Sequence, residues 1–148
     1  HCDSRQIAQQ QISALAPSAW EQGVQLALTE GSSVYLQGLA TLLEVLLRNL
    51  LDNAIRYTGA GTEVVVTAAY AENRAYLAVV DNGRGLAAEE LAKITERFYR
   101  PADTTATGSG LGLSIVQRIV ELHAGSLQIT QAANGRGLSV FIYFPPAT

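Results

Sequence analysis

The sequence is poor in cysteine and in clustered positive charge. Cys2 is its one cysteine, so no intrachain disulfide can form and no second thiol offers metal-ligand spacing. A reducing, cytoplasmic compartment is the simplest expectation. Ten Lys and Arg stand against thirteen Asp and Glu, which gives a net charge of -3. Because a dense basic run is absent, we expect no nucleic acid among the partners.

Long hydrophobic runs are absent as well. The most apolar stretch, residues 36–51, is interrupted by Glu44 and Arg48 and is too short to cross a bilayer. The first residues lack the pattern of a signal peptide. If the parent protein is anchored in a membrane, we expect the anchor outside this sequence.

What the sequence does contain suits one ordinary core. Its 148 residues are 48% apolar and 16% charged, as in a single globular domain. Residues 1–15 are polar and Gln-rich, with a narrow helical stripe of apolar side chains that Pro17 is expected to end. We therefore expect a linker or the end of a dimerisation helix over residues 1–20, and the domain itself over residues 21–148.

Periodicity along the rest of the chain predicts helices and strand pairs in blocks. The expected elements are a strand at 24–28, a buried helix at 39–57, a hairpin of 64–70 and 75–80, a short helix at 87–95, a mobile loop at 101–110, a helix at 112–123 with Gly125 as its C-cap, and strands at 127–130 and 138–144 around Asn134-Gly135. Regular β-α-β alternation is missing. This favours an α+β two-layer sandwich, a mixed and mostly antiparallel sheet covered on one face by about three helices.

A first group of polar side chains lies on the long predicted helix. Asn49, Asn53, Arg56 and Tyr57 recur at spacings of four, three and one, which places them along one helical edge. The two amides could bond local backbone or face solvent. Alternatively, an amide oxygen holds a hydrated cation, with a cationic arm and an aromatic face nearby for phosphate and base.

A second group follows a predicted strand. Asp81, Gly83 and Gly85 stand where glycines let the backbone turn and approach a ligand closely. The Asp-Asn-Gly sequence is also a common turn, and taken alone that interpretation is favoured. A carboxylate at a buried strand end can instead accept a hydrogen bond from an exocyclic amine, which would select adenine.

A third group opens the last predicted helix. Its glycines and free N-terminal amides suit a cradle for anionic oxygens, and a flexible linker rarely runs straight into an amphipathic helix. The residues are Gly108, Ser109, Gly110, Leu111, Gly112 and Leu113. Between the second and third groups, Phe98 is expected to pack and Arg100 to be solvated.

In order, these groups resemble the N, G1, F and G2 boxes of histidine-kinase catalytic domains. The amino-acid sequence of residues 96–100 and 108–118 is especially similar to that of sensor kinases that partner OmpR-type response regulators, including the QseC-like group. The likeness covers roughly residues 24–144. It implies the Bergerat ATP-binding fold shared with Hsp90, MutL and gyrase.

The resemblance implies Mg-ATP as ligand. The ATP-binding residues would be Asn49, Asn53, Arg56, Tyr57, Asp81, Gly83, Gly85, Phe98, Arg100, Gly108, Ser109, Gly110, Leu111, Gly112 and Leu113. Asn53 would coordinate Mg²⁺, supported by Asn49. Asp81 would bind the adenine amine, and Tyr57 would pack on the base. Residues 100–110 would form a lid.

The resemblance also implies the reaction and the partners. ATP-hydrolysing relatives carry a glutamate where this chain has Asn49, and an amide cannot act as general base for water. The expected function is therefore transfer of the γ-phosphate to a histidine in a dimerisation domain outside this chain, for relay to an OmpR-type response regulator. The parent would be a homodimer at the bacterial inner membrane, with this portion cytoplasmic and monomeric by itself.

Two other functions have support in the sequence. Gly83-x-Gly85-x-x-Ala88 with Asp103 imitates the fingerprint of a nicotinamide-dependent oxidoreductase, although Asp103 falls in the polar loop and no β-α-β repeat follows. A non-catalytic nucleotide-binding module, or pseudokinase, would keep the same pocket residues. An anti-sigma-factor serine kinase shares the fold, whereas a P-loop nucleotidase is excluded because Gly-Lys-Ser/Thr is missing.

Overall fold

The fold comes from a computed structural model that describes residues 2–83, 109–131 and 137–146. For Tyr57 and residues 109–113 it describes the backbone only. In chain order the elements are β1 (Cys2–Asp3), α1 (Ser4–Glu21), β2 (Val24–Leu28), β3 (Tyr35–Leu36), α2 (Ala40–Thr58), β4 (Thr62–Ala71), β5 (Arg74–Asp81), α4 (Ser109–Leu122), β6 (Ser126–Gln131) and β7 (Leu138–Tyr143). The expected short helix at 87–95, the loop at 101–108 and the Asn134-Gly135 turn lie outside the described residues.

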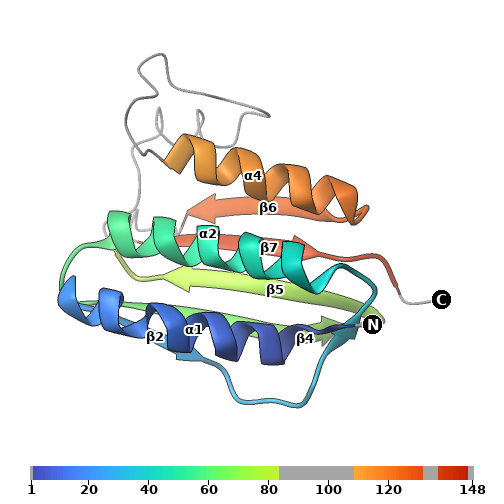
Figure 1. The fold of residues 1–148 in the computed structure, drawn as a ribbon, viewed down its shortest axis with the longest axis horizontal. Helices are drawn as coiled ribbons and strands as arrows, with labels where there is room; N and C mark the ends of the chain where they lie inside the picture. Colours follow the sequence, from blue (N-terminus) through green and yellow to red (C-terminus); the bar gives the residue numbers. More distant parts are fainter. Residues whose placement is uncertain (1, 84–108, 132–136, 147–148) are drawn as a thin grey trace.

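One mixed sheet forms the base of the domain. Its strand order is β2-β4-β5-β7-β6, in which β2 and β4 are parallel and the other neighbours are antiparallel. All three described helices lie on the same side of this sheet (Figure 1). The α+β two-layer prediction is confirmed. Because three of the four strand pairings are antiparallel, the doubly wound parallel sheet of a nicotinamide-dependent oxidoreductase is excluded.

Alternating side chains give the sheet its buried face. In β4, Val64 and Val66 are buried, and on β5 Leu77 and Val79 are buried beside them. The predicted hairpin is confirmed, with both strands slightly longer than periodicity indicated. Valine and leucine at every second position fit a pleated surface that is covered on one side only.

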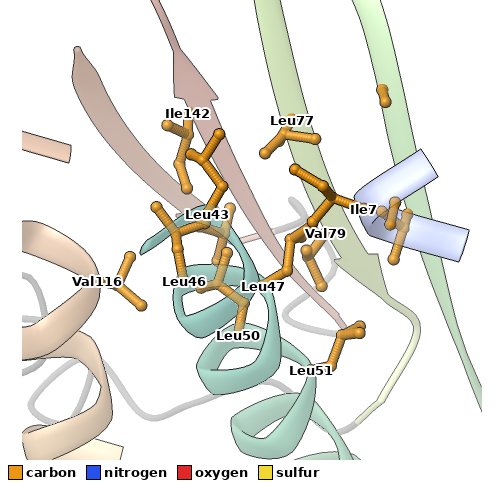
Figure 2. Packing of buried hydrophobic residues seen from close by; sticks show 14 of the residues in the cluster. Ile7, Leu43, Leu46, Leu47, Leu50, Leu51, Leu77, Val79, Val116 and Ile142 are labelled. Atoms are coloured by element: carbon orange, nitrogen blue, oxygen red, sulfur yellow. The ribbon is translucent and has the colours of Figure 1, made fainter. Parts of the chain in front are cut away.

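Helix α2 provides the other half of the core. Five of its leucines recur at helical spacing and are at most 3% exposed: Leu43, Leu46, Leu47, Leu50 and Leu51. Figure 2 shows them pointing toward Leu77 and Ile142 of the sheet and toward Val116 of α4. Helical side chains at these spacings share one face, so burial of that face fixes the rotation of α2.

Helix α1 corrects one prediction. Pro17 was expected to end the N-terminal helix, yet α1 continues through it to Glu21. A proline inside a helix costs about 3 kcal/mol because a backbone hydrogen bond is lost. Ile7 and Ala8 before Pro17, and Ala19 after it, are buried in the core. This packing on both sides holds the helix together despite the proline.

The end of α4 corrects another prediction. Gly125 was expected to provide the left-handed cap, but the left-handed residue is Ala124, with φ of 56°. The Gly125 N–H donates to the Val120 carbonyl oxygen at 2.9 Å and the Ala124 N–H to Glu121 at 3.0 Å, the pattern of a Schellman cap. Gly125 is needed for space, because a Cβ there would stand 2.6 Å from the Tyr143 carbonyl oxygen.

His123 joins the end of α4 to the start of α2. Its Nδ1 lies 2.8 Å from the Ile119 carbonyl oxygen, and its Nε2 accepts the Leu39 N–H at 3.2 Å. These roles require Nδ1 to carry the ring proton. The imidazole therefore serves as a helix cap, which holds the two helices in a fixed relation.

The cap predicts opposite effects at neighbouring positions. Ala124→Gly should raise the free energy of unfolding by about 0.5 to 1 kcal/mol, because glycine adopts left-handed backbone without a Cβ clash. Gly125→Ala should lower it by about 1 kcal/mol or more, because the added methyl group overpacks the site. Denaturant unfolding of both variants beside wild type would check the pair. A stabilised Gly125→Ala would contradict this description of the cap.

Candidate functional site

Three of the elements that carry predicted site residues meet at one end of the sandwich. The C-terminal ends of α2 and β5 and the N-terminal end of α4 lie together there (Figure 1), and α2 contacts both other elements. Asn53, Asp81 and Gly110 stand on these three ends. Segments far apart in the sequence therefore converge on one region.

Asn49 uses its side chain locally. Its Nδ2 donates to the Val45 carbonyl oxygen one turn earlier in α2, at 2.7 Å. This is the local backbone bond that the sequence left open as the simpler interpretation. The bond holds the amide in one orientation and leaves its oxygen for other contacts.

Asn53 is placed differently, although it lies only one turn further on. Its Nδ2 is buried and has no hydrogen-bond partner in the part of the chain that the structure describes. A buried polar atom without a partner costs about 1 to 3 kcal/mol. The oxygen and nitrogen of an amide exchange places by rotation, so the same position can present Oδ1 to a cation. The site therefore fits an oxygen ligand of Mg²⁺.

The described residues alone do not complete such a metal site. Within residues 2–83, 109–131 and 137–146, no three His, Cys, Asp or Glu side chains group together to hold a metal ion. Mg²⁺ commonly takes one or two protein oxygens and fills its remaining positions with water and phosphate. One amide oxygen fits a metal that arrives with a polyphosphate.

Arg56 and Tyr57 lie in the last turn of α2. The Arg56 Nε stands 3.5 Å from Asp52 Oδ2, and both side chains are about half exposed, at 45% and 50%. An ion pair this exposed contributes little to stability. The guanidinium is therefore held near the helix end without being buried. The backbone of Tyr57 is helical, one residue before Thr58.

Asp81 ends β5 and has a distinct environment. Its Oδ1 accepts the N–H of Gly83 at 3.0 Å and the N–H of Leu138 at 3.3 Å. Burial raises the pKa of this carboxyl, while the two N–H bonds act in the opposite direction. Both bonds go to Oδ1, so among the described residues Oδ2 has no donor and can meet a ligand amine.

Gly83 brings the turn after β5 against the end of α2. A Cβ on Gly83 would stand 2.8 Å from both Cα and Cβ of Thr58, so a side chain at this position would clash. On the other side of the turn, Asn82 Oδ1 accepts the Glu63 N–H at 2.8 Å. Glycine at position 83 therefore allows the turn after β5 to lie close against α2.

Helix α4 starts earlier than predicted. It begins at Ser109, so Ser109, Gly110, Leu111, Gly112 and Leu113 form its first turns. The first amides of a helix have no intrahelical acceptor and favour anions. Gly85, Phe98, Arg100 and Gly108 lie outside the described residues, and their roles stay predictions.

The sequence interpretation missed Thr58. Its side chain is 6% exposed, and its Oγ1 has no partner among the described residues. The available signal was its position, a hydroxyl residue directly after Tyr57 at the end of the long predicted helix. Leu138, whose N–H fixes Asp81, could not be found from sequence because 57 residues separate the two.

A second groove adjoins this region, and Asn82 is the described lining residue nearest to Asp81 in the chain. It has a volume of about 580 Å³ and is lined by Trp20, Gly23, Val24, Gln25, Gly61, Thr62, Glu63 and Asn82. None of the predicted ATP-binding residues is among them. Trp20 is 75% exposed, so it is not part of the core.

Comparison with known proteins agrees with this arrangement. A family model described as histidine kinase-, DNA gyrase B- and HSP90-like ATPase matches residues 38–148. Sensor protein kinase PmrB of Pseudomonas aeruginosa is 42% identical over 140 residues, covering 94% of this chain and 29% of PmrB. Sensor protein QseC of Escherichia coli K12 is 44% identical over 130 residues, covering 87% of this chain and 28% of QseC.

Solved structures show the same fold. Full-length ShkA in complex with AMPPNP superimposes with a TM-score of 0.78 at 28% identity, covering 99% of this chain and 31% of ShkA. This chain spans about three tenths of the length of PmrB and QseC. No helix among the described residues is long and apolar enough to cross a membrane.

The half-buried carboxyl predicts a pH-dependent stability difference. Without ligand, Asp81→Asn should be more stable than wild type at pH 7, by at most about 1 kcal/mol, because Asn keeps an oxygen for both N–H groups and avoids burying charge. Since the folded protein holds the Asp81 proton more tightly than the unfolded chain, the advantage should grow as pH rises through the carboxyl titration and shrink below it.

Denaturant unfolding between pH 3 and 8 would measure this difference. Asp52→Asn, at an exposed position of α2, is the matched control and should change stability by no more than about 0.5 kcal/mol. An Asp81→Asn variant that is clearly less stable at pH 7 would show that the carboxylate stabilises the turn.

Proposed function

The chain belongs to the histidine kinase-, DNA gyrase B- and HSP90-like ATPase family as the catalytic domain of a sensor histidine kinase, and we propose that it binds Mg-ATP and donates the γ-phosphate to a histidine in the dimerisation domain of its parent protein. The observation that carries the proposal is the convergence of Asn53, Asp81 and the start of α4 at one end of the sandwich. Asn53 would bind the metal ion, Asp81 the base, and the first amides of α4 the phosphates.

The base and the phosphates have separate partners in this scheme. Asp81 Oδ2 would accept the adenine amine, with Tyr57 packing on the ring. The N-terminal amides of α4, including Gly110 and Gly112, would receive the phosphates. ShkA, whose fold this chain shares, was solved with the ATP analogue AMPPNP, which supports ATP as the nucleotide here.

Metal binding would involve Asn53. With its amide rotated, Oδ1 occupies the position of the buried, unpartnered atom, while Asn49 lies one turn away on the same helical edge. Bound Mg²⁺ would neutralise charge on the triphosphate. Arg56, held at the helix end beside Asp52, would add positive charge near the phosphates.

The side chain at position 49 favours transfer of the γ-phosphate over hydrolysis of ATP. Asn49 carries an amide whose nitrogen is bound to its own helix, and an amide cannot take a proton from water. In the proposed transfer a histidine nitrogen forms a bond to the γ-phosphorus as the bond to the leaving ADP oxygen breaks. His123 cannot be that acceptor while its two ring nitrogens are engaged by Ile119 and Leu39.

The parent protein would be a sensor with further domains. Similarity to PmrB and QseC supports a homodimeric sensor at the bacterial inner membrane that passes its phosphate to an OmpR-type response regulator. This portion would lie on the cytoplasmic side. The dimer contact would lie in the dimerisation domain, so the chain alone would be monomeric.

Phosphotransfer in trans would test the function. Mixed with the dimerisation domain of the same parent, Mg²⁺ and γ-labelled ATP, the wild-type chain should produce acid-labile phosphohistidine. Asn53→Ala should reduce the rate by roughly 100-fold or more, because a group that positions the charged phosphates is lost. Asn73→Ala, in the exposed turn between β4 and β5, is the matched control and should keep the wild-type rate.

Two results would contradict the proposal in different ways. Binding of the ATP analogue without any transfer would favour the non-catalytic, pseudokinase function. No binding of nucleotide at millimolar concentration, with or without Mg²⁺, would refute ATP as the ligand.

A further inference from the structure

The groove at the end of α1 combines an exposed indole with a carboxylate. Trp20 lies in the last turn of α1 and is 75% exposed, the largest fraction among the exposed large hydrophobic side chains of the described residues. Glu63, near the start of β4, is exposed as well. Both residues line the groove, whose volume is about 580 Å³. An indole and a carboxylate therefore border the same hollow.

Hydrogen bonds of the main chain fix the residues around this groove. The Gly61 N–H donates to the Gly23 carbonyl oxygen at 2.8 Å. On the other side, Asn82 Oδ1 accepts the Glu63 N–H at 2.8 Å, and the Asn82 N–H donates to the Glu63 carbonyl oxygen at 3.3 Å. These bonds hold the backbone of Glu63 in place and do not involve its carboxylate.

The lining attracts positive charge. Among the described lining residues Glu63 is the one with an ionisable side chain, and none is Lys, Arg or His. An indole face attracts ammonium and guanidinium groups through its ring quadrupole. Gln25 adds an amide oxygen, and Thr62, whose hydroxyl donates to the Gly59 carbonyl oxygen at 2.7 Å, still has an oxygen that can accept. A carboxylate and an indole together favour a cation over a neutral or anionic ligand.

The size of the groove favours a small molecule over a protein segment. Pockets for small molecules commonly measure about 300 to 1,000 Å³. A stable protein–protein interface takes roughly 20 to 30 residues from each partner, whereas eight of the described residues line this groove. The occupant that fits both size and charge is an organic cation of low molecular mass.

We propose that the groove binds a small organic cation, a guanidinium or alkylammonium compound. Its cationic group stacks on the Trp20 ring and pairs with the Glu63 carboxylate, and its N–H donors meet the oxygens of Gln25 and Thr62. This inference goes beyond the proposed function, because none of the predicted ATP-binding residues lines the groove. The end of α1 and the start of β4 lie at the same end of the sandwich as the nucleotide site (Figure 1), so the domain would carry two neighbouring ligand sites.

Titration with n-butylguanidinium, followed by tryptophan fluorescence, would test the site. Trp20 is the only tryptophan of the chain, so the emission reports on this groove alone. The change should be saturable and should weaken as ionic strength rises. n-Butylurea, a neutral molecule of nearly the same shape, should bind at least about tenfold more weakly, which corresponds to about 1.4 kcal/mol. Equal responses to the two compounds would overturn the proposal.

Two variants separate the carboxylate from the ring. Glu63→Gln keeps the main-chain bonds and should weaken n-butylguanidinium binding about three- to tenfold, because the ion pair is lost. Trp20→Leu, followed by the amide chemical shifts of Gln25 and Thr62, should weaken it by a similar factor. Both side chains are exposed, so the variants should fold as wild type does.

Glu30→Gln is the matched control. It removes the same charge at an exposed position beyond the other end of β2, and its affinity for n-butylguanidinium should equal that of wild type. If Glu30→Gln weakens binding as much as Glu63→Gln does, the cation responds to net charge alone, and the proposed site is refuted.

Further arms separate this site from protein docking and from the nucleotide site. The peptide acetyl-Gly-Arg-Gly-amide should bind no more tightly than n-butylguanidinium, and a peptide that binds tenfold more tightly would replace the small ligand with a protein segment. Absence of n-butylguanidinium binding in a chain that still binds AMPPNP would refute this site alone. Absence of AMPPNP binding in a chain that still binds n-butylguanidinium would refute the proposed function and support this site.

Discussion

Burial of the leucine face of α2 against the sheet is the constraint on which the rest of the site depends. Burial of that face fixes the rotation of the helix about its axis, and this in turn fixes the direction that the edge bearing Asn49 and Asn53 faces. The contact between Gly83 and Thr58 then fixes how the turn after β5 meets the helix end. Apolar packing and one close backbone approach thus bring the end of α2 and the end of β5 together.

The polar groups at this end are costly in the isolated fold. Asn53 and Thr58 bury polar atoms that have no partner among the described residues, and Asp81 holds a carboxyl whose pKa is raised by burial. A sequence selected for stability alone would replace them. Local exceptions to full hydrogen-bond pairing commonly mark functional sites, and two of them, Asn53 and Thr58, occur on α2, whose end touches the turn after Asp81. A ligand that supplied the missing partners would compensate for their cost.

Much of the fold could be predicted because its signals are local. Alternating apolar residues identified the β4–β5 hairpin and the β6–β7 pair, and helical spacing identified α2. Predictions failed where contacts between residues distant in sequence determine the local structure. Core packing keeps α1 helical beyond Pro17. At the end of α4, the nearby Tyr143 carbonyl leaves no room for a side chain on Gly125, and Ala124 adopts the left-handed conformation. The short β1–β3 pair and the Leu138 bond to Asp81 depend on such contacts too. For the candidate site, order and spacing of motifs predicted Asn53 and Asp81, whereas the unpaired hydroxyl of Thr58 became visible through its burial in the structure.

The central claim is that the ends of α2, β5 and α4 form one nucleotide site. Amide chemical-shift mapping of the intact chain with AMPPNP and Mg²⁺ would test it most directly. The account predicts saturable shifts at Asn53, Asp81 and Gly110 that share one dissociation constant, with little change at Trp20 in the groove beside Asn82. Shifts confined to the groove, or separate affinities for the three ends, would contradict it.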